Sequence, residues 1–140
     1  MTGLLRLLCL VMALAAGGTS ALAQKSFVKD DLGSDGVRLE DTFRRELGNR
    51  TVTGPQARRD GEAALARSDY RRALGHFASA IGVEGRVAGN WAGYARAAQG
   101  VEGKDWSERY QLGERATVAA YMAYQRATAR PDEARALALL

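Results

Sequence analysis

The sequence predicts an all-α protein built from short helical hairpins. Apolar residues recur at intervals of three and four along most of the chain, while the β-branched alternation typical of strands is nearly absent. Alanine is abundant, and 16 glycines stand against 2 prolines. Small side chains allow helix backbones to approach closely, which favours stacked helices over a β-sandwich. We therefore expect helices that pack along faces of alanine and glycine.

The first 23 residues have the order of a secretory signal peptide. A basic start precedes an apolar run over residues 7–16, which is too short to anchor the chain across a bilayer. Ala21 and Ala23 supply the small residues that a signal peptidase reads, so we expect cleavage between Ala23 and Gln24. The alternative is a retained amphipathic anchor. The sequence therefore predicts a periplasmic or secreted chain with no membrane span after signal removal.

The residue inventory argues against catalysis within this chain. Its one cysteine, Cys9, lies inside the predicted signal peptide, and its one histidine is His76. Disulfide scaffolds and His/Cys metal sites need several such residues. No serine or cysteine nucleophile is arranged around His76, so we interpret it as a helix-surface residue. We predict no enzymatic activity, no metal and no cofactor.

The charge balance is modestly basic, with 20 basic and 16 acidic residues. Arginine pairs such as Arg44-Arg45 and Arg58-Arg59 are interleaved with acids and form no basic stripe. Mixed charge of this kind is typical of a solvated helix face. We therefore expect protein or peptide partners, or downstream domains of the same polypeptide, and no nucleic acid.

Residues 24–55 are predicted to form a leader with one helix and a linker. The leader is expected to be extended or loosely ordered as far as Gly33. Ser34 or Asp35 can then cap a helix over residues 37–47. The glycine- and proline-containing stretch 48–55 reads as the linker. One face of the helix carries the apolar residues Leu39, Phe43 and Leu47.

Residues 56–140 read as a helical repeat region with short glycine-containing or charged turns. Its predicted helices are Arg58–Ala66, Tyr70–Ile81, Asn90–Ala98, Ser107–Thr128 and Asp132–Leu140.

The first hairpin of this region resembles a tetratricopeptide repeat. In that motif small residues stand where the two helices touch, and an aromatic residue fills the remaining gap. Trp91 follows Ala57 by one repeat period of about 34 residues, with small residues at Ala95 and Ala98. The residues at the motif's spacing in the first hairpin are Gly61, Ala64, Asp69, Tyr70, Ala73, Phe77 and Ala80.

The second repeat is interrupted. An insertion over residues 100–113 delays its second helix, so that Ala120, Tyr124 and Ala127 resume the small–aromatic–small spacing late. Trp91, and Trp106 and Tyr110 of the insertion, are interpreted as packing residues rather than as a ligand platform.

A third unit begins at Asp132 and contains a first helix only. The region thus holds about two and a half repeats, and we interpret it as truncated. The alternative is that residues 132–140 form a docking helix for another subunit.

Repeats of this kind bind partners on the inner face of their first helices. The repeat register places Arg58, Glu62, Arg96 and Gln99 on that concave side. Such a groove could hold an extended peptide or a chain terminus. The alternative is that the repeats only pack against a neighbouring domain.

Three stretches carry a second resemblance: QKSFVKDDLGSDGVRLE at 24–40, WAGYARAA at 91–98 and ERYQLGERAT at 108–117. After a signal peptide, they are similar to the N-terminal region of bacterial alpha-2-macroglobulin-like proteins, which are large exported protease traps. The resemblance implies a non-catalytic segment of an endopeptidase inhibitor whose bait and thioester regions lie downstream. It assigns no inhibitory residue here. The alternatives are a free-standing periplasmic tetratricopeptide adaptor in cell-envelope assembly and a helical accessory region of an envelope enzyme.

Overall fold

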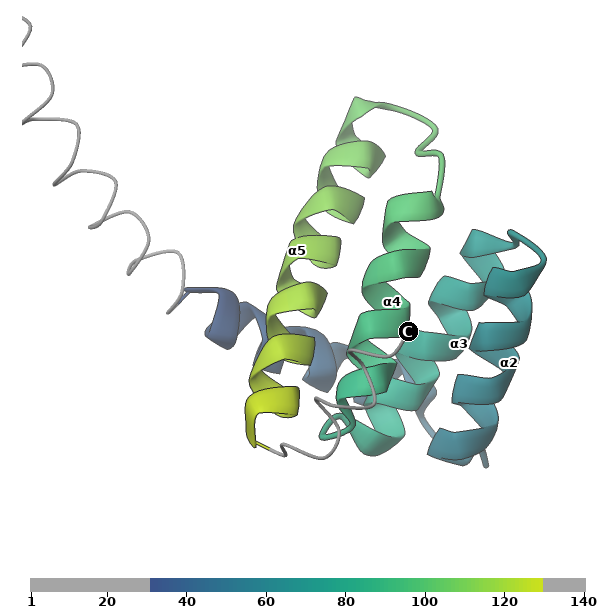
Figure 1. The fold of residues 1–140 in the computed structure, drawn as a ribbon, viewed down its shortest axis with the longest axis vertical. Coiled ribbons are helices and arrows are strands. Elements are labelled where there is room, and N and C mark those ends of the chain that lie inside the picture. Colours follow the sequence, from purple (N-terminus) through teal and green to yellow (C-terminus); the bar gives the residue numbers. More distant parts are fainter. Residues whose placement is uncertain (1–30, 130–140) are drawn as a thin grey trace, which may run out of the picture. The chain divides into compact units, whose positions relative to one another are not determined.

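The computed structural model describes residues 31–129, and these form helices joined by short turns, with no strand among them. A helix over residues 31–47 is followed by α2 (Gly54–Ala66), α3 (Tyr70–Glu84), α4 (Ala88–Gly100) and α5 (Trp106–Ala129). Each of α2 to α5 packs on the next, and Figure 1 shows them as a row with α5 at one end. The predicted all-α fold of helical hairpins is confirmed.

Parts of the prediction lie outside the described residues. These are the signal peptide with its cleavage site at Ala23 and Gln24, and the helix predicted over Asp132–Leu140. Among the described helices, none combines the length and the apolar character needed to cross a membrane.

The helices of the repeat region begin earlier or end later than predicted. The linker covers only residues 48–53, because the Thr53 side chain caps α2 by accepting a 3.3 Å hydrogen bond from the Gln56 N–H. Gly54 and Pro55 thereby fall in the first turn, where proline is well tolerated because no N–H is needed. Asp69 caps α3 in the same way, with a 3.3 Å bond from the Arg72 N–H.

The predicted leader is wrong over its last residues. Residues 31–36 are already helical, so neither Ser34 nor Asp35 begins the helix, and Asp35 instead lies 3.5 Å from Arg38 one turn later. Packing supplies the physical reason: Gly36 is buried against the Met122 side chain of α5, where any Cβ atom would clash. The predicted apolar face is confirmed, since Phe43 is buried and its neighbours Leu39 and Leu47 are half-buried.

Phe77 of α3 lies at the centre of the core, with 1% of its surface exposed. A Cβ atom on Gly61 of α2 would lie 2.9 Å from its ring, and one on Gly93 of α4 would clash with it outright. The ring therefore occupies space that two glycines leave free. Around it, Ala64, Ala73 and Ala80 are fully buried, as the repeat spacing predicted.

The first turn of α4 closes the end of α3. Asn90 is fully buried, and its amide donates to the carbonyl oxygens of Ala80 (3.2 Å) and Glu84 (3.1 Å). The fully buried Trp91 donates from Nε1 to the Gly85 oxygen at 2.7 Å. The bonds to Glu84 and Gly85 add side-chain donors at the end of α3, where carbonyls run out of donors from their own helix.

The structure buries a different face of α5 from the one predicted. Ala120 and Tyr124 are exposed, and only Ala127 of the three predicted contact residues is buried. Alanines recur at a second set of three- and four-residue intervals, and that set packs toward α4 instead. The buried side chains of α5 are Leu112, Ala116, Val118, Ala119, Met122, Ala123 and Ala127.

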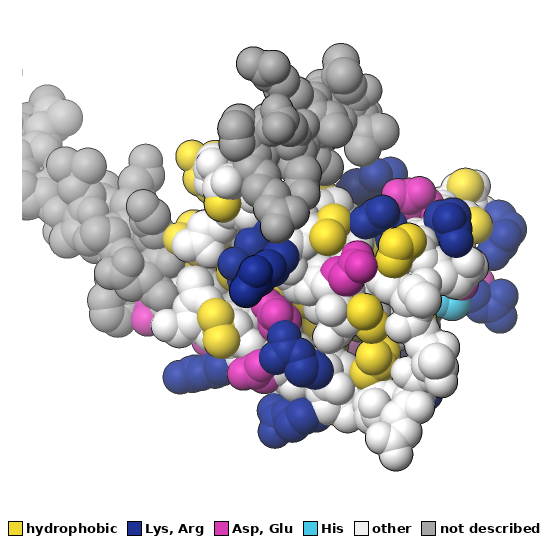
Figure 2. All heavy atoms as spheres, turned by 90° about the horizontal axis from the view of Figure 1, so that it is seen from below, with side chains coloured by type: hydrophobic (Ala, Val, Ile, Leu, Met, Phe, Trp, Pro, Cys, Tyr) yellow, Lys and Arg dark blue, Asp and Glu magenta, His cyan; other side chains and the backbone are white. Residues whose placement is uncertain are grey.

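Charged side chains on the surface are mixed in sign. On the face seen in Figure 2, arginine and lysine side chains lie among acidic and apolar ones. Arg44 illustrates the pattern, since it pairs with Glu40 at 2.7 Å and with Asp41 at 3.0 Å along one helix. Such exposed pairs contribute little to stability.

The loop between α4 and α5 is held by Glu108. Its carboxylate accepts from Arg71 of α3 at 2.9 Å and from the Lys104 N–H at 2.6 Å, while its own N–H donates to Asp105 at 2.8 Å. The hydrogen bond from Arg71 is the main reason why the pKa of Glu108 is lowered to about 2.

Replacing Gly93 by alanine should destabilise the fold by roughly 1–3 kcal/mol, because the added Cβ forces the buried Phe77 ring to move. Gly75→Ala is the matched control. A Cβ at Gly75 meets nothing within 4 Å, so the higher helix propensity of alanine should stabilise α3 by roughly 0.5–1 kcal/mol. Urea unfolding followed by circular dichroism measures both. A Gly93→Ala variant as stable as Gly75→Ala would contradict the packing described for Phe77.

Acid should weaken the fold partly through Glu108. Because its pKa is about 2 in the folded chain against an ordinary 4.5, the unfolded chain takes up the proton first as the pH falls. The stabilisation is complete above pH 4.5 and is lost as the pH falls toward 2. Glu108→Gln should therefore lower Tm at neutral pH and flatten its fall below pH 5, whereas the exposed Glu62→Gln should follow the wild type. Parallel acid profiles for Glu108→Gln and wild type would overturn this role.

Candidate functional site

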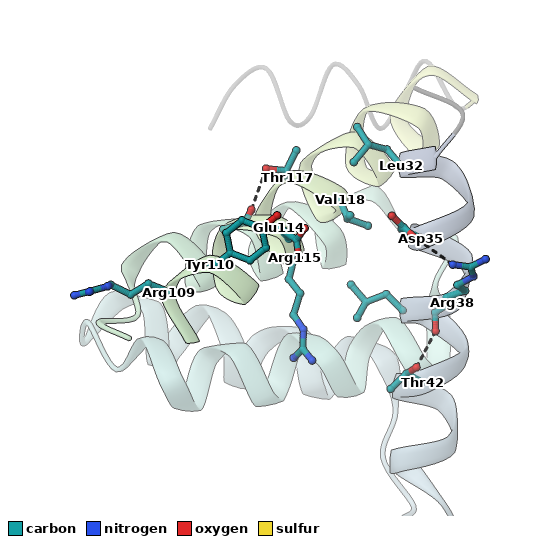
Figure 3. Close-up of a pocket in the computed structure, with 12 residues that line it drawn as sticks. Leu32, Asp35, Arg38, Thr42, Arg109, Tyr110, Glu114, Arg115, Thr117 and Val118 are labelled. Carbon is teal, nitrogen blue, oxygen red and sulfur yellow. Dashed lines mark hydrogen bonds and ion pairs between the residues drawn. The ribbon is translucent and has the colours of Figure 1, made fainter. Parts of the chain in front are cut away.

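A groove opens between helix 31–47 and α5. The two helices touch where Gly36 meets the Met122 side chain and where Glu40 lies 3.4 Å from Arg126. Away from this crossing they diverge and leave a groove of about 790 Å³, whose walls come from both helices in Figure 3. Its lining residues are Leu32, Asp35, Arg38, Leu39, Thr42, Arg109, Tyr110, Gly113, Glu114, Arg115, Thr117 and Val118.

The groove combines apolar and charged walls. Leu32 and Leu39 are half-buried and Val118 is buried, and all three pack on or within the main core. The Asp35–Arg38 pair stands on the helix 31–47 side, as Figure 3 shows. A surface of this kind offers contact area to apolar side chains and a polar edge to the groups around them.

The two threonines of the groove are satisfied within their own helices. Thr42 Oγ1 donates to the Arg38 carbonyl and Thr117 Oγ1 to the Gly113 carbonyl, both at 2.9 Å. Bonds of this kind from residue i to i−4 occupy the hydroxyl proton. The threonines therefore contribute shape more than hydrogen-bond donors to a molecule in the groove.

Arg115 connects the groove to the core. Its positive charge acts on the hydroxyl of Tyr94, whose side chain is almost fully buried and whose ring lies 5.1 Å from that of Phe43. Burial raises the pKa of Tyr94, and the nearby positive charge of Arg115 opposes that rise. The tyrosine hydroxyl thus stays protonated at neutral pH.

An exposed aromatic pair stands at the α5 edge of the groove. Trp106 is 71% exposed and Tyr110 is 54% exposed, and their rings stack with centroids 5.4 Å apart and planes 22° apart. Tyr110 also bonds to the Glu114 carboxylate, which raises its pKa. Large exposed aromatics on a soluble protein are typical of contact surfaces.

The structure confirms a packing role for one of the three aromatic residues that were predicted to pack, and contradicts it for the other two. Trp91 is fully buried, so its packing role is confirmed. The same interpretation is wrong for Trp106 and Tyr110, because they occupy the first turn and a half of α5 and point away from the buried face of that helix.

The predicted concave residues lie on α2 and α4, away from this groove. Arg58 is half-buried and donates to Asn90 Oδ1 at 3.4 Å, which ties α2 to α4. Glu62, Arg96 and Gln99 are exposed, and none of the four lines the groove beside α5. A binding role for these four residues stays a prediction.

The groove is lined by apolar and charged side chains. In the part of the chain that the structure describes, no three His, Cys, Asp or Glu side chains are close enough to hold a metal ion. His76 is half-buried on α3 and does not line the groove. The groove instead offers apolar contact, a stacked aromatic surface and fixed charges.

Sequence reasoning missed this groove, although one signal for it was present. Trp106, Tyr110, Gly113 and Thr117 follow each other at intervals of four, three and four, which places them on one helix face. A second apolar face on a helix that already has a buried face indicates a surface for another contact. The wall from helix 31–47 carried no comparable signal.

Compared with models of protein families, with curated proteins and with solved structures, the chain matches none of them. The resemblances to tetratricopeptide repeats and to alpha-2-macroglobulin-like proteins therefore stay predictions. The function proposed below is inferred from the residues and geometry of the described helices.

The two tryptophans should respond differently to a soluble quencher. Trp91 is fully buried whereas Trp106 is 71% exposed, so iodide should quench mainly Trp106. Trp106→Phe should leave a blue-shifted emission with a several-fold smaller quenching constant. Trp91→Phe should keep the quenchable emission and lower Tm, because it removes the hydrogen bond to Gly85. Equal quenching in the two variants would contradict the exposure of Trp106.

Proposed function

We propose that this chain is a non-catalytic helical module that binds protein segments in the groove between helix 31–47 and α5. One observation carries the proposal: an open groove of about 790 Å³ joins apolar walls to an exposed aromatic stack. Peptide-binding surfaces on helical proteins use the same combination of an apolar centre and a polar rim.

The charges of the groove indicate what kind of segment fits. Three arginines, Arg38, Arg109 and Arg115, line it against the two carboxylates Asp35 and Glu114. Asp35 is paired with Arg38, so Arg109 and Arg115 remain against Glu114 and the lining carries a net positive charge. The groove therefore favours a segment whose apolar side chains are flanked by acidic ones.

The biological setting of this binding rests on the sequence. With the predicted signal peptide and the stretches at 24–40, 91–98 and 108–117, the module is an exported part of an alpha-2-macroglobulin-like endopeptidase inhibitor. The groove then holds another domain of the same polypeptide. In the alternative, a free-standing periplasmic adaptor, it holds a separate envelope protein. The coding sequence after residue 140 distinguishes the two, since inhibitor domains follow only in the first.

The groove can be blocked without disturbing the core. A Cβ at Gly113 meets nothing within 4 Å, so Gly113→Gln should fill the groove and leave the fold intact. Peptides selected from a random phage-displayed library on the full chain should combine apolar and acidic residues. Their affinity should fall about tenfold or more in Gly113→Gln, the size of a well-placed interface residue.

Gly75→Gln is the matched control, because Gly75 is equally unencumbered but lies on α3 outside the groove. It should bind the selected peptides like the wild type. If Arg58→Ala with Arg96→Ala weakened binding while Gly113→Gln did not, the peptides would occupy the concave surface predicted from the sequence. If the library yielded no peptide that binds, the proposed function would be wrong.

A further inference from the structure

The exposed residues of α5 are of two chemical kinds. One set recurs at intervals of four and three along the helix and carries no charge. The exposed residues beside it are polar or charged, among them Ser107, Arg109, Gln111, Glu114, Gln125 and Thr128. The uncharged set, the α5 stripe, consists of Trp106, Tyr110, Gly113, Thr117, Ala120 and Tyr124. Another apolar surface can cover the α5 stripe without burying a charge.

The α5 stripe is large at its ends and small at its centre. Trp106 and Tyr124 end it with most of their surface exposed, whereas Gly113 and Thr117 stand in the middle. The Thr117 hydroxyl already donates to the Gly113 carbonyl at 2.9 Å, so covering it leaves no donor without a partner. A second helix can therefore approach the α5 backbone closely at this point.

The order of residues in the α5 stripe is complementary to itself when its direction is reversed. If a second α5 runs antiparallel with its Thr117 level with Gly113 of the first, each Tyr110 comes level with Ala120 of the other copy. A large ring then meets a small residue, and the aromatic residues at the ends come level with each other. A parallel pair would instead set Tyr110 against itself and leave the small residues facing each other across a gap. The stripe therefore fits a two-fold antiparallel pair, in which one patch packs on its own copy.

The exposed area is that of a weak dimer. The side chains of Trp106, Tyr110 and Tyr124 are 71%, 54% and 67% exposed, and at about 200 Å² each they offer roughly 400 Å² per copy. Two copies thus bring roughly 800 Å² from these rings, and the small residues add to it, against the about 1,200 Å² at which stable interfaces begin. Glu114 follows Gly113 directly, so two like charges would face each other at the rim and weaken the pair further.

We propose that two copies of the chain pair antiparallel through the α5 stripe in a weak two-fold dimer. Tyr110, Gly113 and Thr117 belong both to the stripe and to the lining of the groove. A second copy and a peptide in the groove therefore exclude each other, a consequence that rests on the proposed function. The pairing itself rests only on the composition and exposure of the stripe.

Position-specific disulfides test the pairing in the full chain. Cys9, the only native cysteine, is replaced by serine. One chain then carries Tyr110→Cys and a second, lengthened by a tag, carries Ala120→Cys, so that non-reducing electrophoresis separates the mixed disulfide from the two homodimers. The rates are measured in glutathione buffer. The control uses Gln111→Cys in place of Tyr110→Cys, since Gln111 is also exposed but lies about 100° further around the helix.

The mixed disulfide between Tyr110→Cys and Ala120→Cys should form at least tenfold faster than either homodimer and than the control disulfide. In the antiparallel pair, the same residue of the two copies is separated by about 15 Å along the helices, which is beyond the reach of a disulfide. Homodimers of Tyr110→Cys that form as fast as the mixed disulfide would show a parallel pair. Equal rates for Tyr110→Cys and Gln111→Cys would show random collision, and either result would refute the proposal.

Ala120→Arg separates this dimer from the proposed function. Ala120 does not line the groove, so the variant should lower the dimer fraction several-fold in sedimentation equilibrium and keep the affinity for peptides selected on the groove. Gln125→Arg, exposed but off the stripe, is the matched control and should dimerise like the wild type. If Ala120→Arg also dimerised like the wild type, or if the wild type stayed monomeric at about 1 mM, the pairing would be wrong whatever the peptides do.

Discussion

The close approach of three helices around Phe77 is the constraint on which the rest of the structure depends. Gly61 and Gly93 have no side chain where the ring lies, so α2 and α4 both contact α3 through one aromatic residue. Asn90 and Trp91 complete the same junction by bonding to carbonyls at the end of α3. A larger residue at either glycine position would push the helices apart. The hydrogen bonds of Asn90 would then be lost, because they need the close native spacing of α3 and α4.

Helix 31–47 uses the same kind of contact to join the row. A Cβ on Gly82 of α3 would lie 3.0 Å from the Phe43 backbone, so the two backbones nearly touch there. At the other side of the crossing, Glu40 lies 3.4 Å from Arg126 of α5. These contacts fix the angle at which the helix leaves α5, and the groove is the space that this angle creates. The candidate site is therefore a consequence of packing by a helix that precedes the predicted repeat region.

Local signals made much of the fold predictable. The Gly61 to Ala80 pattern specified which face of the first hairpin is buried. The cap at Thr53 was missed, because residues 48–55 have the composition of a linker. The sequence did not predict which face of α5 is buried. Alanines occur on two of its faces, and only the packing against α4 decides which of them is buried. The start of helix 31–47 and the groove depend on Met122, which lies far away in the sequence. Nothing near Gly36 indicates that partner.

The position of Arg115 links the lining of the groove to the interior of the bundle. Its positive charge opposes the rise that burial causes in the pKa of Tyr94, and the ring of Tyr94 packs against Phe43 of helix 31–47. One side chain therefore contributes both to the surface of the groove and to the electrostatics of the core. Replacing Arg115 would alter the groove and the pKa of Tyr94 together, so a variant at this position does not report on the groove alone.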